Sequence, residues 1–444
     1  MNRMFSNAQL KRLILPLLVE QLLIMLVGMI DTVMVSSVGE AAVSGVSIVN
    51  EVNFLVITIL SALAAGGAVI VSQYLGNRDK ENADLSASQL VLVATLIAVG
   101  LTVLCLVFCK QILQLLYGSV APDVMEAAIT YFWITTLSFP FLALYNSASA
   151  MYRSMNATKS IMYVSIIMNT INVVGNYFCI YHLNMGVAGV AWPTTISRMV
   201  AAFLLCGMAF SKTNPVSIEW KNIFSWHGSL IKRILNIAIP NAVENSLFQF
   251  GRVVVTIFIA TYGTSQIAAN GVANSFSTLS IIVSGAMQLA IVTVVGQCVG
   301  ANDYEQANYY MKKMLWIAQI LGTINCVLVL LAMPYGMKLY TLTDATVEIV
   351  KVIMYWNALF TALLHPLAFV LPNGLRAAGD AKFTMVVGVL SMFLTRITLA
   401  YLLGTVCHMY VLGVYFAMFS DWVVRIICFV YRWKSEKWKN FRAI

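Results

Sequence analysis

Apolar runs of about twenty residues recur along the whole chain, each long enough to cross the hydrocarbon core of a bilayer as a helix. We expect twelve such helices, at residues 12–38, 44–75, 85–109, 125–151, 160–181, 186–210, 231–262, 268–299, 309–332, 346–371, 383–404 and 408–432. The polar segments between them are short, and the longest of them, residues 211–228, is too small for a soluble domain. The pattern therefore predicts an all-α integral membrane protein.

Composition agrees with this prediction, since 60% of the 444 residues are hydrophobic and only 10% are charged. The basic residues are placed unevenly. Of the 27 Lys and Arg residues, 20 lie at the N-terminus, in the even-numbered loops and in the C-terminal tail, whereas the odd-numbered loops hold only Lys110 and Lys338. Because cytoplasmic loops carry the excess of Lys and Arg, we expect both termini in the cytoplasm. This topology accounts for the net charge of +9, so we predict no nucleic-acid partner.

The two halves of the chain resemble each other when the sequence is shifted by 224 positions. The shift aligns Pro16, Glu20, Gly39 and Asn50 with Pro240, Glu244, Gly263 and Asn274, and it aligns "QYLGNRD" with "QCVGAND". Because each half has an even number of helices, both enter the membrane from the same side, as in transporters with two parallel repeats. We therefore predict two six-helix lobes related by a pseudo-two-fold axis along the membrane normal. The N-lobe would span 1–210, a cytoplasmic linker 211–230 and the C-lobe 231–444.

Two carboxylates, Glu20 and Asp31, lie in the first apolar run. They are eleven residues apart, or about 16 Å along one helix stripe. A charge at bilayer depth costs a few kcal/mol and persists where it faces a polar interior, so both residues are functional candidates. The repeat separates them, because Glu20 aligns with Glu244 whereas Asp31 aligns with Val255. A feature of both lobes suits a gate or a structural pairing, and a feature of one lobe suits ion coupling.

The fifth helix offers partners for Asp31. Asn169, Asn172 and Asn176 share one of its faces, and Thr194 follows Pro193 on the sixth helix at a comparable depth. A carboxylate among amide and hydroxyl oxygens suits Na⁺, and the same carboxylate in an apolar environment is a proton acceptor. The residues leave both ions open.

These motifs resemble those of the multidrug and toxic compound extrusion (MATE) family, in its bacterial form. The resemblance rests on Pro16 followed by Asp31-Thr32 and Gly39, on the "QYLGNRD" turn, on "YRSMNATK" and on "LPNGLRAAGDAKFTM". It implies export of organic, cationic compounds of many kinds, driven by inward movement of H⁺ or Na⁺ through rocker-switch alternating access.

The resemblance also bears on the site. Asp31, Asn172, Asn176 and Thr194 match the cation network of family members that have an Asp where this chain has Asn176. The chain thus has one acid fewer there, so Na⁺ at Asp31, Asn172 and Asn176 stays one alternative and H⁺ the other. A second branch of the family carries acids in the C-lobe at the positions of Phe248 and His365, and their absence here favours coupling in the N-lobe.

Other intramembrane polar residues are candidates for the substrate cleft or for gating. Glu51 lies between Asn50 and Asn53, where its charge would attract cations, and Asn274 repeats Asn50 in the C-lobe. Arg252 is expected to pair with an acid across the cavity. Asp421 and Arg425, at i and i+4, are expected to pair with each other.

The alternative function is a lipid-linked oligosaccharide flippase of the same superfamily, which would line its cavity with arginines such as Arg198, Arg252 and Arg396. An enzyme is not expected, because the chain has no acidic metal-binding loop and no nucleophile motif. We expect the protein to work as a monomer without a cofactor, with small organic cations and the lipid bilayer as its partners.

Overall fold

The computed structural model describes residues 3–118, 120–338, 340 and 342–444, and every regular element within them is a helix. Eleven helical segments are long and apolar enough to span a membrane. The pair α5 and α6, bent by 46° at its break, supplies the twelfth span. The predicted all-α membrane protein with twelve spans is thereby confirmed.

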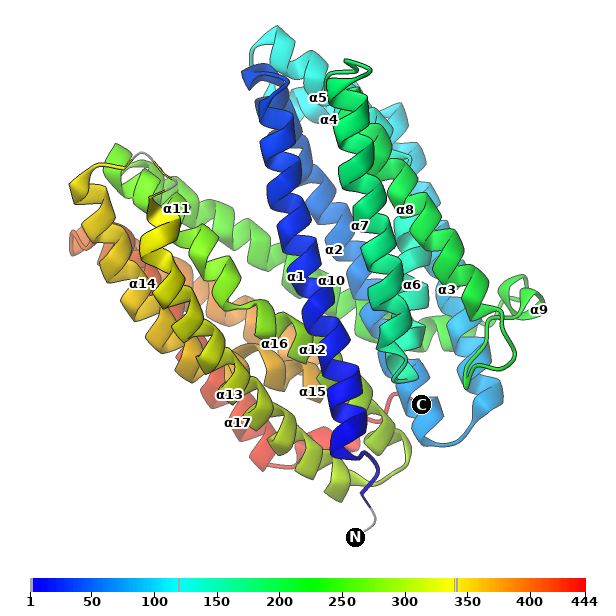
Figure 1. The fold of residues 1–444 in the computed structure, drawn as a ribbon. Helices are drawn as coiled ribbons and strands as arrows, with labels where there is room; N and C mark the ends of the chain where they lie inside the picture. The colour runs from blue at the N-terminus through cyan, green and yellow to red at the C-terminus, as the bar shows by residue number, and fades with distance from the viewer. Residues whose placement is uncertain (1–2, 119, 339, 341) are drawn as a thin grey trace. The chain divides into compact units, whose positions relative to one another are not determined.

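The described chain forms two compact units that divide within helix α10 (Figure 1). The first, Phe5–Ala242, contains α1 (Asn7–Ser36), α2 (Glu40–Gly76), α3 (Lys80–Val107), α4 (Cys109–Tyr117), α5 (Pro122–Thr136), α6 (Phe139–Ser154), α7 (Thr158–Tyr181), α8 (Ala188–Ala209), α9 (Trp220–Ile223) and the start of α10 (Gly228–Ala260). We call it the N-unit. The predicted lobe boundaries at 210 and 230 stay a prediction.

The second unit, Val243–Ala443, is called the C-unit. After the remainder of α10 it contains α11 (Thr264–Ser280), α12 (Ile282–Gly300), α13 (Tyr304–Met337), α14 (Asp344–His365), α15 (Leu371–Ala377), α16 (Ala381–Leu390) and α17 (Tyr410–Lys434). Three π-helical segments, η1 (Pro366–Val370), η2 (Ser391–Ile397) and η3 (Ala400–Val406), and the short 3₁₀ helix η4 (Lys437–Asn440) complete it.

Helix α2 is the centre of the N-unit and packs against α3, α5 and α6. Its small residues allow this packing. A Cβ on Gly45 would lie 2.9 Å from Ala127 Cβ, so the glycine brings α2 and α5 into direct contact. Val49 and Phe132 are fully buried in the same core. Helix α1 lies beside α7, which in turn lies beside α8, and this arrangement positions the polar residues described below (Figure 1).

The C-unit is built around α17 and α12. Helix α17 packs against α14, η2 and η3, while α12 packs against α13 and α15. Ile353, Met354 and Val411 are fully buried in its core. These contacts place the charged residues of α17 next to those of α10 and η2.

The internal repeat appears as turns of the same geometry. Gly39 and Gly263 precede α2 and α11 with φ of 132° and 94°, a region of backbone conformation that favours glycine. In the "QYLGNRD" turn and its counterpart, Asp79 and Asp303 cap α3 and α13 by accepting hydrogen bonds from the third residue on, at 3.1 and 2.9 Å. The repeated motifs therefore encode helix ends.

Several predicted spans are interrupted in the structure, among them 383–404, which passes into the π-helix η2 at Ser391. The span predicted at 125–151 bends between α5 and α6, beside Pro140, which lacks an N–H to donate to the preceding turn. The span at 268–299 breaks at Ile281, and the span at 346–371 passes into the π-helix η1 at Pro366. Hydropathy identifies spans by length, and it does not report such local breaks.

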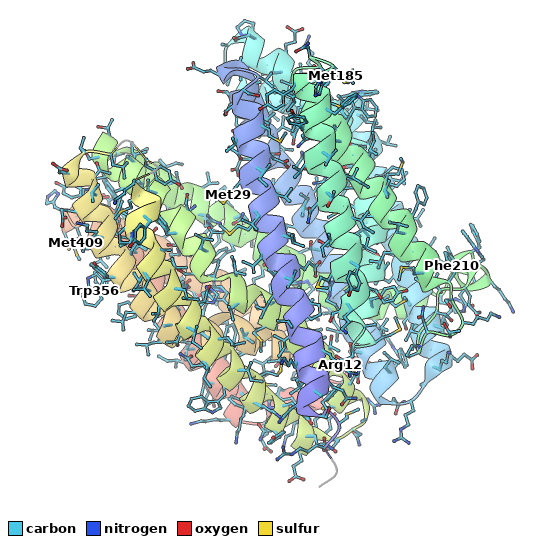
Figure 2. The ribbon with its side chains drawn as sticks, in the orientation of Figure 1. Arg12, Met29, Met185, Phe210, Trp356 and Met409 are labelled. Carbon is cyan, nitrogen blue, oxygen red and sulfur yellow. The ribbon has the colours of Figure 1, made fainter. Side chains whose placement is uncertain are left out.

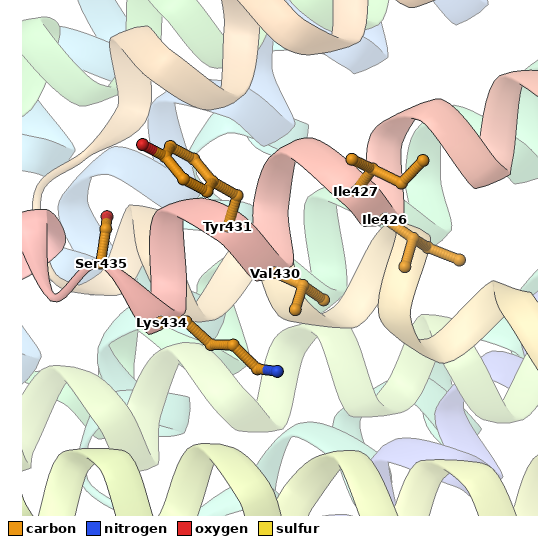
Figure 3. Close-up of a pocket in the computed structure, with 6 residues that line it drawn as sticks. All are labelled: Ile426, Ile427, Val430, Tyr431, Lys434 and Ser435. Atoms are coloured by element: carbon orange, nitrogen blue, oxygen red, sulfur yellow. The ribbon is translucent and has the colours of Figure 1, made fainter.

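A hollow of about 570 Å³ follows α17, lined by Ile426, Ile427, Val430, Tyr431, Lys434 and Ser435 (Figure 3). Its walls are mostly apolar and come from one helix. None of the candidate site residues lines it. We interpret it as a groove on the helix surface, separate from the polar clusters of the two units.

Candidate functional site

Asp31 is a half-buried carboxylate in the last two turns of α1. Met29, two residues earlier, marks this part of α1 (Figure 2). The segment is a continuous helix because no residue after Pro16 interrupts it, and Pro16 itself lies near the opposite end. Helix packing brings Asp31 to α7, whose polar face is buried.

A chain of hydrogen bonds joins Asp31 to α7 and α8. Asn176 Nδ2 donates to Asp31 Oδ1 at 2.7 Å and to Asn172 Oδ1 at 3.4 Å. Asn172 Nδ2 donates to Thr194 Oγ1 at 3.0 Å, and Thr194 donates to the Val190 carbonyl at 2.9 Å. The structure thus brings together all four residues that the sequence proposes for the cation site. Asn169, on the same face, instead donates to Ser165 at 3.3 Å.

Two residues outside the predicted set accompany this chain. Arg198 on α8 interacts electrostatically with Asp31, and its Nη1 donates to Ser138 Oγ at 2.8 Å. Tyr131 on α5 lies within electrostatic range of both Asp31 and Arg198, and its hydroxyl donates to Asn50 Oδ1 at 3.4 Å. Asp31 is therefore a single negative charge that faces one nearby positive charge.

This arrangement has one acceptor left over. Asn176 is completely buried, and its Oδ1 has no hydrogen-bond partner within the part of the chain that the structure describes. A buried acceptor without a partner costs about 1–3 kcal/mol. Because Nδ2 is the atom that faces Asp31, the Asn176 amide would have to turn over before Oδ1 met a proton on Asp31 or a cation beside it. No group of three His, Cys, Asp or Glu side chains with metal-site geometry occurs among the described residues.

Glu20 lies four residues after Pro16 on α1 and is 5% exposed. Its charge interacts with Arg153 at the end of α6, and one of its carboxylate oxygens, Oε2, has no hydrogen-bond partner among the described residues. Arg153 belongs to the "YRSMNATK" motif. This motif therefore supplies the positive charge for an acid buried in the first helix.

Glu244, the counterpart of Glu20, forms a closer pair in the C-unit. It lies four residues after Pro240, is 7% exposed and forms a buried ion pair with Arg376, from the repeated "LRAAGDAK" motif. Arg425 Nη1 lies 3.8 Å from Glu244 Oε1. Because the same motif pairs with the same helix position in both units, the acids Glu20 and Glu244 are a repeated feature of the fold.

The predicted pair of Asp421 and Arg425 is confirmed, with Arg425 Nε 3.1 Å from Asp421 Oδ1. The two positions that carry acids in the second family branch are occupied here by a phenylalanine and a histidine. Phe248 lies beneath the guanidinium groups of Arg396 and Arg425, each 5.3 Å from its ring centre. His365 forms a hydrogen bond of 2.8 Å with Ser284 and stacks on Phe369. The C-unit thus has no carboxylate at either position.

The cleft candidates differ in exposure. Glu51 and Asn274 are exposed, as is Asn50, although Tyr131 donates to it. Asn53, by contrast, is buried, and its side chain donates a hydrogen bond to Thr135 at 3.1 Å. Arg252 departs from expectation, because it is exposed and its Nη1 donates a hydrogen bond to Gln249 at 3.3 Å and not to an acid.

Sequence reasoning missed Arg153, Arg198 and Arg376 as partners of the buried acids. Arg198 follows Thr194 by four residues on the same helix, so the spacing alone could have indicated it. Arg153 and Arg376 lie in the motifs used to recognise the repeat, and the matching Glu–Arg pairs could have been read from that alignment.

Comparison with known proteins gives a consistent result. The family model described as MatE matches residues 16–178 and 240–402, two ranges displaced by 240 − 16 = 224 residues, the same shift as the internal repeat. An uncharacterized transporter of Bacillus subtilis, YisQ, is 28% identical over 432 residues, covering 95% of this chain and 93% of its own.

A probable multidrug resistance protein of Thermotoga maritima, NorM, is 25% identical over 444 residues and covers 98% of this chain and 94% of its own. Among solved structures, an outward-facing conformation of a multidrug resistance MATE family transporter has a TM-score of 0.90 at 20% identity. It covers 97% of this chain and 96% of its own, which shows a shared fold.

Proposed function

The chain belongs to the MATE family of multidrug efflux transporters, and we propose that it exports organic compounds in exchange for protons that bind at Asp31. The family assignment covers most of both repeats and makes the protein a multi-pass membrane transporter. The coupling ion, the substrates and the mechanism are our proposal. The observation that carries it is the contact between Asp31 and Asn176, beside an acceptor that has no partner.

The charges around Asp31 support H⁺ over Na⁺. A tight Na⁺ site needs several oxygen ligands with net negative charge, whereas here Asn172, Asn176 and Thr194 are neutral and Arg198 adds a positive charge. Asn176 presents an N–H donor to Asp31, so the oxygen that a cation would require is turned elsewhere. A proton needs only the carboxylate. Na⁺ remains the competing ion in the experiment below.

Protonation would act through the hydrogen bonds of Asp31. The bond from Asn176 to a charged carboxylate contributes about 1.5–3 kcal/mol, and a neutral carboxyl group loses part of this. A change of about 1.4 kcal/mol shifts a two-state equilibrium tenfold, so this difference suffices to favour one packing of α1 against α7 over another. A tenfold proton gradient and 100 mV supply about 1.4 and 2.3 kcal/mol per ion. These energies match the scale of the proposed switch.

We propose a rocker-switch cycle in which the two lobes, 1–210 and 231–444, alternate around a central cleft and both termini stay in the cytoplasm of a bacterial inner membrane. Glu51, Asn50 and Asn274 are the exposed polar residues that would meet organic cations there. Glu20 and Glu244 would hold the middle turns of α1 and α10 through their arginine partners. We expect a monomer without cofactor or enzymatic activity.

The flippase alternative relies on several arginines free to bind pyrophosphate. Arg198 does not meet this requirement, because its guanidinium donates a hydrogen bond to Ser138 and interacts with the charge of Asp31. Arg252 and Arg396 belong to the C-unit.

The test is uptake of ethidium into proteoliposomes that hold the full chain, under an imposed H⁺ gradient or an imposed Na⁺ gradient. We expect the H⁺ gradient alone to drive transport, and Asp31→Asn to abolish that coupling. Glu348→Gln serves as a control for the loss of a negative charge, at an exposed ion pair with Lys351. Transport driven only by Na⁺ would overturn the choice of ion, and proton coupling that persists in Asp31→Asn would overturn the site.

A further inference from the structure

The charged side chains around α10, η2 and α17 in the C-unit do not balance. Glu244 is engaged by Arg376 and Arg425, and Asp421 is engaged by Arg425. Arg396 interacts electrostatically with Asp421 and Arg425 of this group, and Arg252 interacts electrostatically with Arg396. The six side chains therefore carry four positive and two negative charges, a surplus of 4 − 2 = +2.

Arg396 is the most unusual member of the group. It is 8% exposed, and its Nε has no hydrogen-bond partner within the described part of the chain. Its guanidinium lies 5.3 Å from the ring centre of Phe248 and is attracted by the charge of Asp421, but neither contact uses the Nε–H donor. A buried charge without a hydrogen-bonded partner costs several kcal/mol. Such a residue persists more readily where a ligand supplies the partner.

A close contact between α10 and η2 brings Arg252 near Arg396. Helix α10 approaches η2 closely at Gly251, where an added Cβ would overlap the side chain of Met392. Arg252 follows Gly251 directly, and Arg396 lies one turn beyond Met392 within the π-helical segment. π-helical turns are rare and occur often at functional sites. Arg252 and Arg396 thus repel each other across a tight helix contact.

We propose that Arg252 and Arg396 form a subsite for an oxyanion, the carboxylate, sulfonate or phosphate group of a transported compound. Guanidinium groups present a planar fork of N–H donors that matches such oxygens two at a time. An anion would satisfy Arg396 Nε and offset the mutual repulsion of the two charges. The proposal rests on the efflux function proposed above, and it extends the substrates to compounds that carry an acidic group.

The test measures binding of 5-carboxyfluorescein to the purified full chain in lipid nanodiscs, by fluorescence polarisation. We compare the native protein with Arg396→Gln, Arg252→Gln and the control Lys351→Gln, which removes one positive charge from an exposed ion pair with Glu348. Loss of charge-assisted hydrogen bonds predicts about ten- to hundredfold weaker binding for either arginine variant and no change for the control. Arg396→Lys keeps the charge but not the fork, so we expect an intermediate affinity.

The proposal is overturned if the native protein does not bind the dye, or if Arg252→Gln and Arg396→Lys both bind as the native protein does. If Arg396→Gln does not fold, the affinities of Arg252→Gln and Arg396→Lys still decide whether the subsite exists. Native ethidium transport driven by a proton gradient, without dye binding, would reject the subsite and leave the proposed function standing. Adding phosphatidylglycerol to the discs separates two sources of the oxyanion. If the lipid weakens binding of 5-carboxyfluorescein, the subsite binds a lipid headgroup. If the affinity for the dye is unchanged, the subsite binds a soluble compound.

Discussion

The ion pair of Glu244 with Arg376 gives a prediction of stability that is independent of transport. Both side chains are almost inaccessible, at 8% and 10% relative exposure, and Arg425 adds a second positive neighbour at 3.8 Å. Removing one partner of a buried pair costs about 3–5 kcal/mol, because the other charge stays buried without compensation. Glu244→Ala should therefore lower the free energy of unfolding by that amount. Arg376→Ala should cost less, since Glu244 keeps Arg425.

The coupling between the two residues sharpens this prediction. In the double variant neither charge of the pair remains, so its cost should fall below the sum of the single costs by about 1–3 kcal/mol. The matched control is Glu348→Ala, which breaks an ion pair with Lys351 at a glutamate that is 69% exposed. A surface pair of this kind contributes about 0–1 kcal/mol.

The eight free cysteines provide the assay. Cys407 is exposed and three others are half-buried, whereas four are buried and become available to a thiol-reactive dye on unfolding: Cys105, Cys109, Cys298 and Cys326. Titration with sodium dodecyl sulfate in mixed micelles, followed by dye labelling, gives the free energy of unfolding for each variant. Equal losses for Glu244→Ala and Glu348→Ala, or single costs that add without remainder in the double variant, would refute the buried pair as the source of stability.

Three further predictions concern local features and are tested by the same assay. Gly388→Ala would place a methyl group 2.5 Å from Glu244 Oε1 and should displace that carboxylate, lowering stability by about 1–3 kcal/mol, and an unchanged variant would contradict the packing. Gly39→Ala, at a φ of 132°, should lower the free energy of unfolding by about 1 kcal/mol or more. Its control Gly100→Ala, which has open space around it in α3, should leave this free energy unchanged or raise it. Equal effects of the two substitutions would refute the conformational argument. Asp303→Ala removes the cap of α13 and should cost about 0.5–2 kcal/mol, and no loss would show that the cap is dispensable.

Much of the fold follows from the sequence because hydrocarbon imposes simple rules. Span length and the positions of Lys and Arg predict twelve helices, and the 224-residue repeat predicts the paired turns at Gly39 and Gly263. The breaks at Pro140 and Pro366 were not predicted. A proline alone does not show whether neighbouring helices satisfy the freed backbone groups or allow a bend.

The site could be predicted where the geometry of a single helix determines which residues share a face. Helical spacing and depth brought Asn172 and Asn176 to Asp31. The partner expected for Arg252 was wrong, because charge alone does not tell whether an arginine faces an acid or an open surface. Arg376 lies 132 residues after Glu244, and such a contact depends on the packing of several helices, which a single sequence does not state.

The central claim is that Asp31 carries the coupling proton. Proton release on addition of ethidium to the purified protein in weakly buffered detergent, followed with a pH-sensitive dye, tests it most directly. We expect release by the native protein and by the control Glu348→Gln, and none by Asp31→Asn that still binds ethidium. Undiminished release from Asp31→Asn, or ethidium binding by the native protein with no release at any pH, would contradict it.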